Sequence, residues 1–161
     1  MPAMTDPTNA LTSFQEHLDG LELQQCELDS NLYLHVDNPS GPNSLRFTYV
    51  RIEAGVVTAL AMLALGEPME DGPCFELGYA VPEHLRGQGR AQSAVRSALA
   101  EIKHGFGRSG ARPFYVHAVV ARDNAASKRV AEATLAAKAE EITDAFSGTP
   151  AVRYLHKVVY P

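Results

Sequence analysis

The stretch Glu76–Ala91, ELGYAVPEHLRGQGRA, decides the fold of this 161-residue chain. Between Phe75 and Val81 large apolar residues alternate with other residues, which is the period-2 pattern of a β-strand. Pro82 ends that strand because it has no N–H group to donate. A glycine-rich loop follows, and apolar residues then recur at helical spacing and form one face of a helix. These apolar positions are Ala91, Ala94, Val95, Ala98, Leu99, Ile102 and Phe106.

The loop carries Gly87 and Gly89 directly before the helix. The first N–H groups of a helix have no partner within it and carry the positive end of its dipole. Since glycine has no Cβ, an anion can approach these N–H groups closely. One helix terminus contributes only about 0.3–2 kcal/mol through its dipole, so several N–H groups must converge to hold a ligand. The loop is therefore a candidate phosphate site.

Two common phosphate-binding loops do not fit this sequence. A Walker A loop needs Gly-Lys followed by Ser or Thr, where this chain has Gly89-Arg90-Ala91. A dinucleotide fingerprint needs a third glycine, where this chain has Gln92. An ordinary strand-to-helix turn without a ligand is the alternative that the residues leave open.

A third kind of loop does fit. Arg86-x-x-Gly89-x-Ala91, directly after a strand ending in GYAVP, resembles the acetyl-CoA pyrophosphate loop of the GNAT (GCN5-related) N-acetyltransferase family. The resemblance implies acetyl-CoA as co-substrate and no metal. The residues it implies around this loop are Ala80, Val81, Arg86, Gly87, Gln88, Gly89, Arg90 and Ala91.

A second segment, ARDNAASKRVAE at residues 121–132, is similar to the region after the fifth strand of GNAT enzymes. It most resembles the RimJ/RimL-like branch, with Asn-x-x-Ser followed by Arg-Val-Ala-Glu. Asn124 and Ser127 share one face of a helix N-terminus because they are three residues apart. The resemblance implies that Asn124 bonds the pantetheine chain and that Ser127 lies near the CoA sulfur. The alternative is that Asn124 only caps the helix and Ser127 faces solvent.

The order of predicted elements also resembles the GNAT fold. We expect an α/β (α+β) single domain over residues 1–161, with residues 1–8 as a disordered arm and a mixed sheet of about six to seven strands flanked by helices. The resemblance implies that Phe75–Val81 and Phe114–Val120 splay apart to admit the pantetheine arm. The other predicted strands are Leu32–Val36, Ser44–Glu53, Val56–Leu65, Glu140–Ala145 and Val152–Val159, and the other predicted helices cover residues 9–19 and about 124–137.

The chemistry implied by the resemblance is transfer of an acetyl group to a primary amine by direct attack on the thioester. The N–H of Val81 would stabilise the oxyanion, and Glu76 would be the base, through water. Many GNAT enzymes have a tyrosine acid where this chain has Ala131, which leaves Ser127 as the local donor. Glu76 as a solvated strand residue is the alternative, and His117 is a second candidate base or a packed strand histidine.

The free-energy cost of deprotonating the amine indicates the class of acceptor. Neutralising a lysine at pH 7 costs about 4–5 kcal/mol, whereas an α-amine costs only about 1 kcal/mol. With no strong base visible, we expect a protein N-terminal α-amine or a small-molecule amine. A module that binds acyl-CoA without turnover, as a sensor or structural element, stays open as the alternative. The residues Arg86, Arg90, Arg122, Lys128 and Arg129 are candidate phosphate contacts, and a solvated surface charge is the alternative for each.

Two departures from the family pattern affect the acceptor site. GNAT chains often have a Gly-Phe pair where this chain has Leu135-Ala136-Ala137, so we expect the backbone approach to the substrate to be altered there. The segment before Ser44, which forms much of the acceptor pocket in the family, is short. Acceptor identity is therefore the property that the sequence predicts least well.

Composition argues against several other classes of protein and of binding site. The net charge of −5 and the absence of a Lys/Arg run argue against a nucleic-acid surface. The longest apolar run, Val56–Leu65, is too short for a membrane span, which needs about 20 residues. Cys26 and Cys74 are predicted to be free thiols, and no His/Cys pair has metal-ligand spacing. Without a signal peptide the expected location is the cytoplasm, and the resemblance allows a homodimer.

Overall fold

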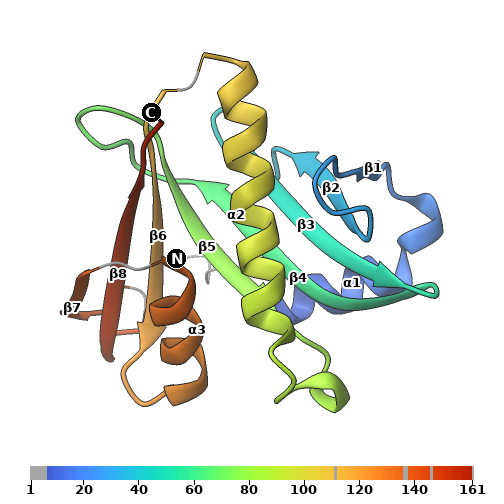
Figure 1. Cartoon of the computed structure of the whole chain (residues 1–161). Helices are drawn as coiled ribbons and strands as arrows, with labels where there is room; N and C mark the ends of the chain where they lie inside the picture. Colours follow the sequence, from blue (N-terminus) through green and yellow to red (C-terminus); the bar gives the residue numbers. More distant parts are fainter. Residues whose placement is uncertain (1–6, 111, 136–137, 146, 161) are drawn as a thin grey trace.

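The computed structural model describes residues 7–110, 112–135, 138–145 and 147–160, which form one eight-stranded sheet with three α-helices (Figure 1). The spatial strand order is β1-β2-β3-β4-β5-β6-β8-β7, and among these described strands only the β5–β6 pair is parallel. The strands are β1 (Gln24–Gln25), β2 (Leu32–Asp37), β3 (Arg46–Glu53), β4 (Val56–Leu65), β5 (Cys74–Ala80), β6 (Phe114–Ala121), β7 (Lys138–Thr143) and β8 (Pro150–Val158). The helices are α1 (Pro7–Glu16), α2 (Arg90–Arg108) and α3 (Ala125–Leu135), with 3₁₀ turns η1 (Leu18–Gly20) and η2 (Glu83–Leu85).

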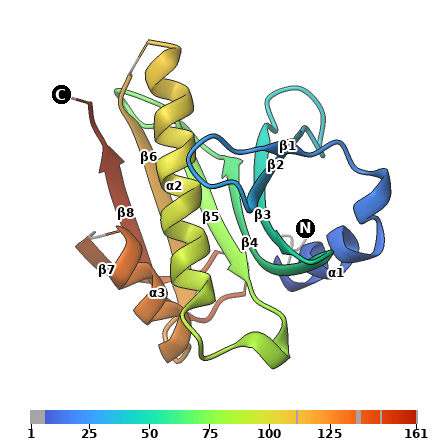
Figure 2. The ribbon, with the colours of Figure 1, turned by 45° about the vertical axis from the view of Figure 1, so that its right-hand side comes forward.

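The helices cover the sheet on both faces. Helices α2 and α3 lie side by side over one face, and α1 lies against the other, as the two ribbon views show (Figure 2). The main core lies under α2 and α3 and contains their buried residues Val95, Ala98 and Leu135. A second cluster joins Leu11 and Phe14 of α1 to the opposite face of β3 and β4. The apolar stripe predicted for α2 therefore faces the sheet, as expected.

The β3–β4 hairpin follows from local chemistry. Ala54 and Gly55 both have positive φ, 50° and 77°, and β3 and β4 pair from Glu53 and Val56 onward. A two-residue loop with two positive φ angles matches the right-handed twist of its strands. The predicted hairpin and both of its strands are confirmed.

Several predicted boundaries differ from the structure. The sheet has eight strands because of β1, whose two exposed glutamines carry no apolar alternation that could predict a strand. Helix α1 begins at Pro7, which suits the first helical position because its missing N–H is not needed there. It therefore includes the last two residues of the expected arm, while residues 1–6 lie outside the described part. Strand β7 begins two residues before the predicted start.

The pairing of β5 and β6 is confined to one end of the two strands. Their rungs are Cys74–Tyr115, Phe75–Val116 and Glu76–His117, and the ladder stops there. Beyond the last rung, β5 pairs only with β4 and β6 pairs only with β8. The splay expected between these strands is thus present. The point at which they separate, immediately after Glu76 and His117, is called the fork below.

Candidate active site

The glycine loop, residues 86–91, turns the chain from η2 into α2. Gly87 and Gly89 have φ angles of 78° and 74°, a left-handed conformation that costs other residues roughly 1–2 kcal/mol. Gly89 is the N-cap of α2, and no side chain caps this helix. A Cβ at either glycine would meet no atom within 4 Å. The glycines are therefore required by backbone conformation, and the space in front of them is open.

The loop presents a row of main-chain donors. The first α2 N–H with a partner is that of Ser93, which donates to Gly89 O at 3.1 Å. Within the described part of the chain, the N–H groups of residues 87–92 have no acceptor. Together with the helix dipole they form a site suited to a phosphate or diphosphate. This arrangement fits the pyrophosphate group expected from the sequence.

Two arginines of the loop are held by other parts of the protein. Arg86 donates from Nε to the carbonyl oxygen of Val81 at 3.1 Å and so fixes the turn between β5 and the loop. Arg90 forms an ion pair with Glu53 at 3.0 Å and bonds Gln88. Both arginines therefore have structural contacts in addition to any contact with a phosphate.

The remaining cations that the sequence singled out lie beyond the loop. Arg122 lies 3.4 Å from Glu141 as an exposed ion pair. Lys128 and Arg129 of α3, like Arg86 of the loop, have no ion pair within the described residues, so three of the five cations carry charges that no carboxylate there neutralises.

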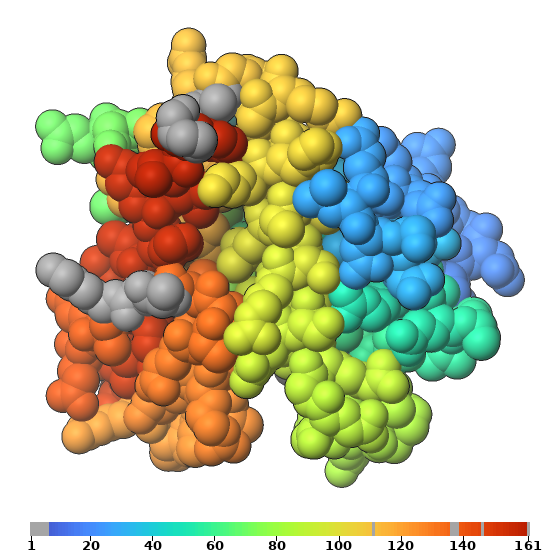
Figure 3. Space-filling model, viewed as in Figure 1, coloured from blue at the N-terminus to red at the C-terminus, as the bar shows by residue number. Residues whose placement is uncertain are grey.

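The N-terminus of α3 lies beside the start of α2. Asn124 caps α3, because its Oδ1 accepts the N–H of Ser127 at 3.1 Å. Asn124 therefore caps the helix, which the sequence left open. Its amide NH₂ group has no partner among the described residues. Space-filling atoms show a notch in the outline between the green loop before α2 and orange α3 (Figure 3).

Sequence reasoning missed Tyr79. Its hydroxyl donates to the carbonyl oxygen of Ser127 at 2.8 Å, so this side chain connects β5 to the first turn of α3 beyond the fork. Burial raises the pKa of Tyr79, which keeps the hydroxyl protonated as a donor. The only sequence signal was the period-2 alternation, which indicates a packed residue and says nothing about a partner 48 positions away.

Glu76 and His117 form the last rung before the fork. Their neighbours Phe75, Leu77 and Val116 belong to the core under α2, so both polar side chains lie on the opposite face of the sheet. Burial raises the pKa of the Glu76 carboxyl, and the carboxylate of Asp144 raises it further. Burial lowers the pKa of His117, and so does the charge of Arg153. Both shifts favour a group that can accept a proton near neutral pH.

The N–H of Val81 follows the end of β5. Val81 is buried, and no hydrogen bond of its N–H occurs within the described residues. The donor expected at this position is therefore present and unpaired. The structure thus brings together, around one fork, the glycine loop, Val81, Tyr79, the α3 N-terminus and the Glu76–His117 rung.

Comparison with known proteins supports this arrangement at the level of the fold. No protein-family model and no curated protein matches the sequence. Solved structures do match. An acetyltransferase of the GNAT family from Streptococcus pneumoniae aligns with a TM-score of 0.56 and 11% identity, over 97% of this chain and 98% of that one. RimL, a ribosomal L7/L12 α-N-protein acetyltransferase in complex with coenzyme A, aligns at 0.52 and 20% identity over 69% of this chain. The chain has the GNAT fold.

The extent of the match differs between these structures. The aligned part spans 61% of the RimL chain in the coenzyme A complex. A NatC complex bound to Gag peptide and CoA contains a chain that aligns with a TM-score of 0.56 and 12% identity, over 97% of this chain and 84% of that one. At such identities the GNAT fold is what the comparison establishes.

Two departures from the usual GNAT pattern can be placed in the fold. Ala131, at the position of the expected tyrosine acid, is fully buried in α3, so a hydroxyl there would require repacking. The segment between β2 and β3, residues 38–45, is a short loop closed by a hydrogen bond from Ser44 Oγ to Gly41 O. Ala136 and Ala137, where the altered substrate approach was expected, lie outside the described residues.

The described residues contain neither a metal-ligand cluster nor a membrane-spanning helix. No three or more His, Cys, Asp or Glu side chains gather as metal ligands there. None of the helices among these residues has the length and apolar character needed to cross a bilayer. Cys26 and Cys74 are both free thiols, as predicted.

Proposed function

We propose that this protein is an acetyl-CoA-dependent N-acetyltransferase acting on a primary amine. The observation that carries the proposal is the row of unpaired N–H groups at residues 87–92, placed at the mouth of a splayed β5–β6 pair. A bare helix N-terminus alone favours any phosphate. A splayed pair beside it adds what a phosphate site alone lacks, because an extended arm would run between the separated strands toward the centre of the sheet.

Each residue has a role that its position allows. The amides of the glycine loop would hold the diphosphate, with Lys128 and Arg129 as nearby cations. The NH₂ group of Asn124 would bond the pantetheine arm, while its Oδ1 continues to cap α3. The half-buried Ser127 would donate its hydroxyl to the sulfur. Bound acetyl-CoA would supply an activated acetyl group and a thiolate leaving group.

The groups proposed for proton transfer and for stabilising the oxyanion lie on β5 or directly after it. The N–H of Val81 would donate to the developing oxyanion, a kind of contact worth roughly 3–4 kcal/mol in enzymes where one donor has been removed. Glu76 would accept the proton of the attacking amine on a carboxylate oxygen, directly or through water. Its raised pKa makes it a better base than an ordinary surface glutamate. His117 on the same rung is the competing candidate base.

The acceptor is an α-amine or a small-molecule amine rather than a lysine side chain. Neither Glu76 nor His117 is a strong base, and only about 1 kcal/mol is needed to deprotonate an α-amine at pH 7. The same step for lysine costs about 4–5 kcal/mol. A panel of peptides with free or blocked N-termini tests this assignment. Transfer confined to lysine side chains would refute it.

The central test is the charge at residue 89. Asn and Asp both tolerate a left-handed backbone and have nearly the same size. Gly89→Asn should retain CoA binding, whereas Gly89→Asp should weaken it by more than about tenfold, because a carboxylate would face the diphosphate. Gly148, with a φ of 71° in the β7–β8 turn, provides matched control variants. Equal CoA affinity of the Asn and Asp variants at position 89 would reject the loop as the diphosphate site.

Turnover is tested separately from binding. Saturating CoA at about 100 times its Kd should add about 2.7 kcal/mol to the free energy of unfolding. Release of CoA thiol from acetyl-CoA in the presence of an amine panel should follow for an enzyme. Stabilisation by CoA without thiol release across the panel would instead identify an acyl-CoA-binding module.

A further inference from the structure

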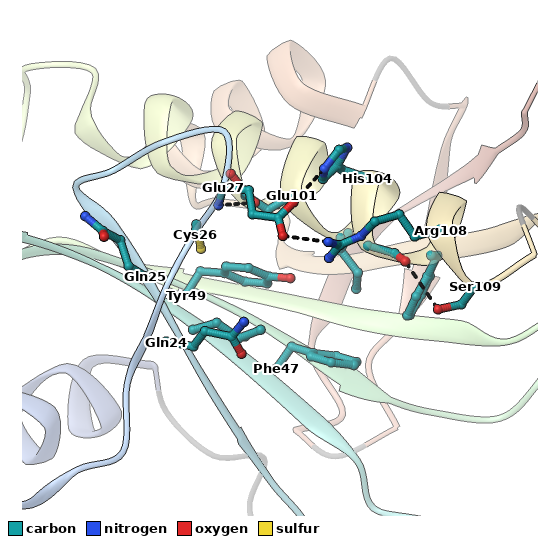
Figure 4. A pocket seen from close by; sticks show the side chains of 14 residues that line it. Gln24, Gln25, Cys26, Glu27, Phe47, Tyr49, Glu101, His104, Arg108 and Ser109 are labelled. Atoms are coloured by element: carbon teal, nitrogen blue, oxygen red, sulfur yellow. Dashed lines mark hydrogen bonds and ion pairs between the residues drawn. The ribbon is translucent and has the colours of Figure 1, made fainter.

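A cavity of about 240 Å³ lies on the α2 face of the sheet, at the opposite end of α2 from the glycine loop (Figure 4). Its floor is aromatic, with Phe47 and Tyr49 from β3 and Phe106 from α2. Its wall is the chain from β1 to Cys26 and Glu27, which passes over β3. None of these residues belongs to the proposed active site. We call this space the distal cavity.

The wall of the distal cavity is fixed to α2. Glu101 is only 8% exposed, and its carboxylate accepts the main-chain N–H groups of Glu27, Leu28 and Asp29. The Glu27 carboxylate bonds His104 at 2.8 Å and Arg108 at 2.5 Å. A cavity between parts that are bonded to each other persists, whereas a gap beside a loose loop would close.

Tyr49 reaches into this space with an unused polar group. The residue is only 2% exposed, yet its hydroxyl has no hydrogen bond within the described residues. The hydroxyl is not among the fully enclosed unsatisfied atoms, so it meets the distal cavity. In the close view it projects into the space below Arg108 (Figure 4). A buried hydroxyl that lacks a partner costs roughly 1–3 kcal/mol, and an occupant with a polar atom at this place would recover that loss.

His104 and Arg108 line the cavity but are both bonded to the Glu27 carboxylate, so burial of the lining is what disfavours an anionic ligand. Burial and then the Glu101 carboxylate raise the pKa of Cys26 to about 12, and Asp29 adds to the rise. Burial, Cys26 and Glu101 together raise the pKa of Tyr49. Both groups are therefore neutral donors at physiological pH. The burial that keeps them protonated, together with the Glu101 carboxylate, would oppose a carboxylate ligand.

We propose that the distal cavity is a second ligand site, which binds a neutral aromatic molecule of one ring or two fused rings carrying a hydroxyl group. The ring would lie against Phe47 and Phe106, and the ligand hydroxyl would pair with the hydroxyl of Tyr49. A dry cavity of about 150 Å³ lined by apolar side chains is sufficient for benzene, so a space of this volume accommodates a substituted ring. The site is independent of the proposed activity, since it shares no residue with the glycine loop.

The test compares phenol with benzoate on the full chain by NMR titration. Phenol should bind with a Kd of about 1 mM or tighter and shift resonances of Phe47, Tyr49 and Phe106. Benzoate, with the same ring but a negative charge, should bind at least about tenfold more weakly. Tyr49→Phe keeps the ring and should weaken phenol binding several-fold. Tyr33→Phe is the matched control, because Tyr33 does not line the cavity.

Two further measurements distinguish the distal cavity from other sites. Cys26→Leu should occupy part of the space and abolish phenol binding. Saturating CoA should leave the phenol Kd unchanged. Equal binding of phenol and benzoate, unchanged phenol affinity in Tyr49→Phe, or displacement of phenol by CoA would each overturn the proposal. The Tyr49→Phe comparison remains decisive even if Cys26→Leu fails to fold.

Discussion

The hydroxyl of Tyr79 lies 2.8 Å from the carbonyl oxygen of Ser127, and this single hydrogen bond joins β5 to α3 across the region where β5 and β6 have separated. A splayed pair of strands has lost its ladder hydrogen bonds at the point where a ligand is expected to enter. The side chain of Tyr79 supplies a connection there that the backbone cannot, and it limits how far α3 can move from β5.

Removing this hydroxyl should loosen the cleft without unfolding the protein. Tyr79→Phe keeps the ring and deletes the bond, so the free energy of unfolding should fall by about 0.5–1.5 kcal/mol. Urea unfolding measures the loss, and Tyr33→Phe, whose hydroxyl has no bond among the described residues, should show little change. CoA affinity of the same variant reports whether the cleft geometry changed. A variant as stable as the parent would show that the bond contributes nothing to the connection.

Two substitutions of Asn124 should separate its role as a helix cap from its proposed role in binding CoA. Asn124→Asp keeps the oxygen that accepts the N–H of Ser127 and removes the NH₂ donor. Asn124→Ala removes both and should lower stability by about 1 kcal/mol. The Asp variant should match the parent in urea unfolding yet bind CoA more weakly. If the Asp variant binds CoA as tightly as the parent does, Asn124 is only a helix cap.

Substituting Glu76 should change the free energy of unfolding by an amount that depends on pH. Because its pKa is higher in the folded protein than in the unfolded chain, ionisation opposes folding, and stability is lost as the pH rises through the folded pKa. Glu76→Gln should therefore be more stable than the parent at pH 7. The difference should vanish below about pH 4, where an unfolded glutamate is protonated. Thermal unfolding at several pH values measures it, with exposed Glu83→Gln as a control that should show no such trend.

The same variant tests the proposed base. Glu76→Gln should lower kcat/KM by about 10²–10⁴-fold if Glu76 takes the proton of the amine. His117→Asn should then have a smaller effect and leave the acid limb of the pH–rate profile in place. If His117→Asn instead shows the large loss of kcat/KM, His117 is the base.

Glu101 should prove to be a structural carboxylate. It accepts three main-chain N–H groups, so Glu101→Gln exchanges charge-assisted bonds for weaker ones and places an NH₂ group among donors. We expect a loss of about 2–3 kcal/mol in urea unfolding. Hydrogen exchange should increase at residues 27–29 and remain unchanged in the glycine loop. Protection that persists at residues 27–29 would contradict the assigned role.

The sequence alone determined the elements whose signals are local. Gly89 before an amphipathic helix, Pro82 after an alternating strand and Ala54-Gly55 between two apolar runs each restrict the nearby backbone strongly. The glycine loop, the capping position of Asn124 and most strands could be predicted for this reason. Strand β1 could not, because two exposed glutamines form a strand only when β2 is already in place to pair with them.

Only the tertiary structure decided which distant side chains meet. Tyr79 and Ser127 are brought together because β5 ends beside α3, and Glu76 lies opposite His117 because the register of β5 and β6 places both on one rung. Glu101 accepts three main-chain N–H groups from residues 27–29, which lie more than 70 positions away in the sequence. Local backbone preferences depend on a few neighbouring residues, so they can be predicted from the sequence. Contacts between elements depend on packing and register, for which a single sequence carries no comparable signal.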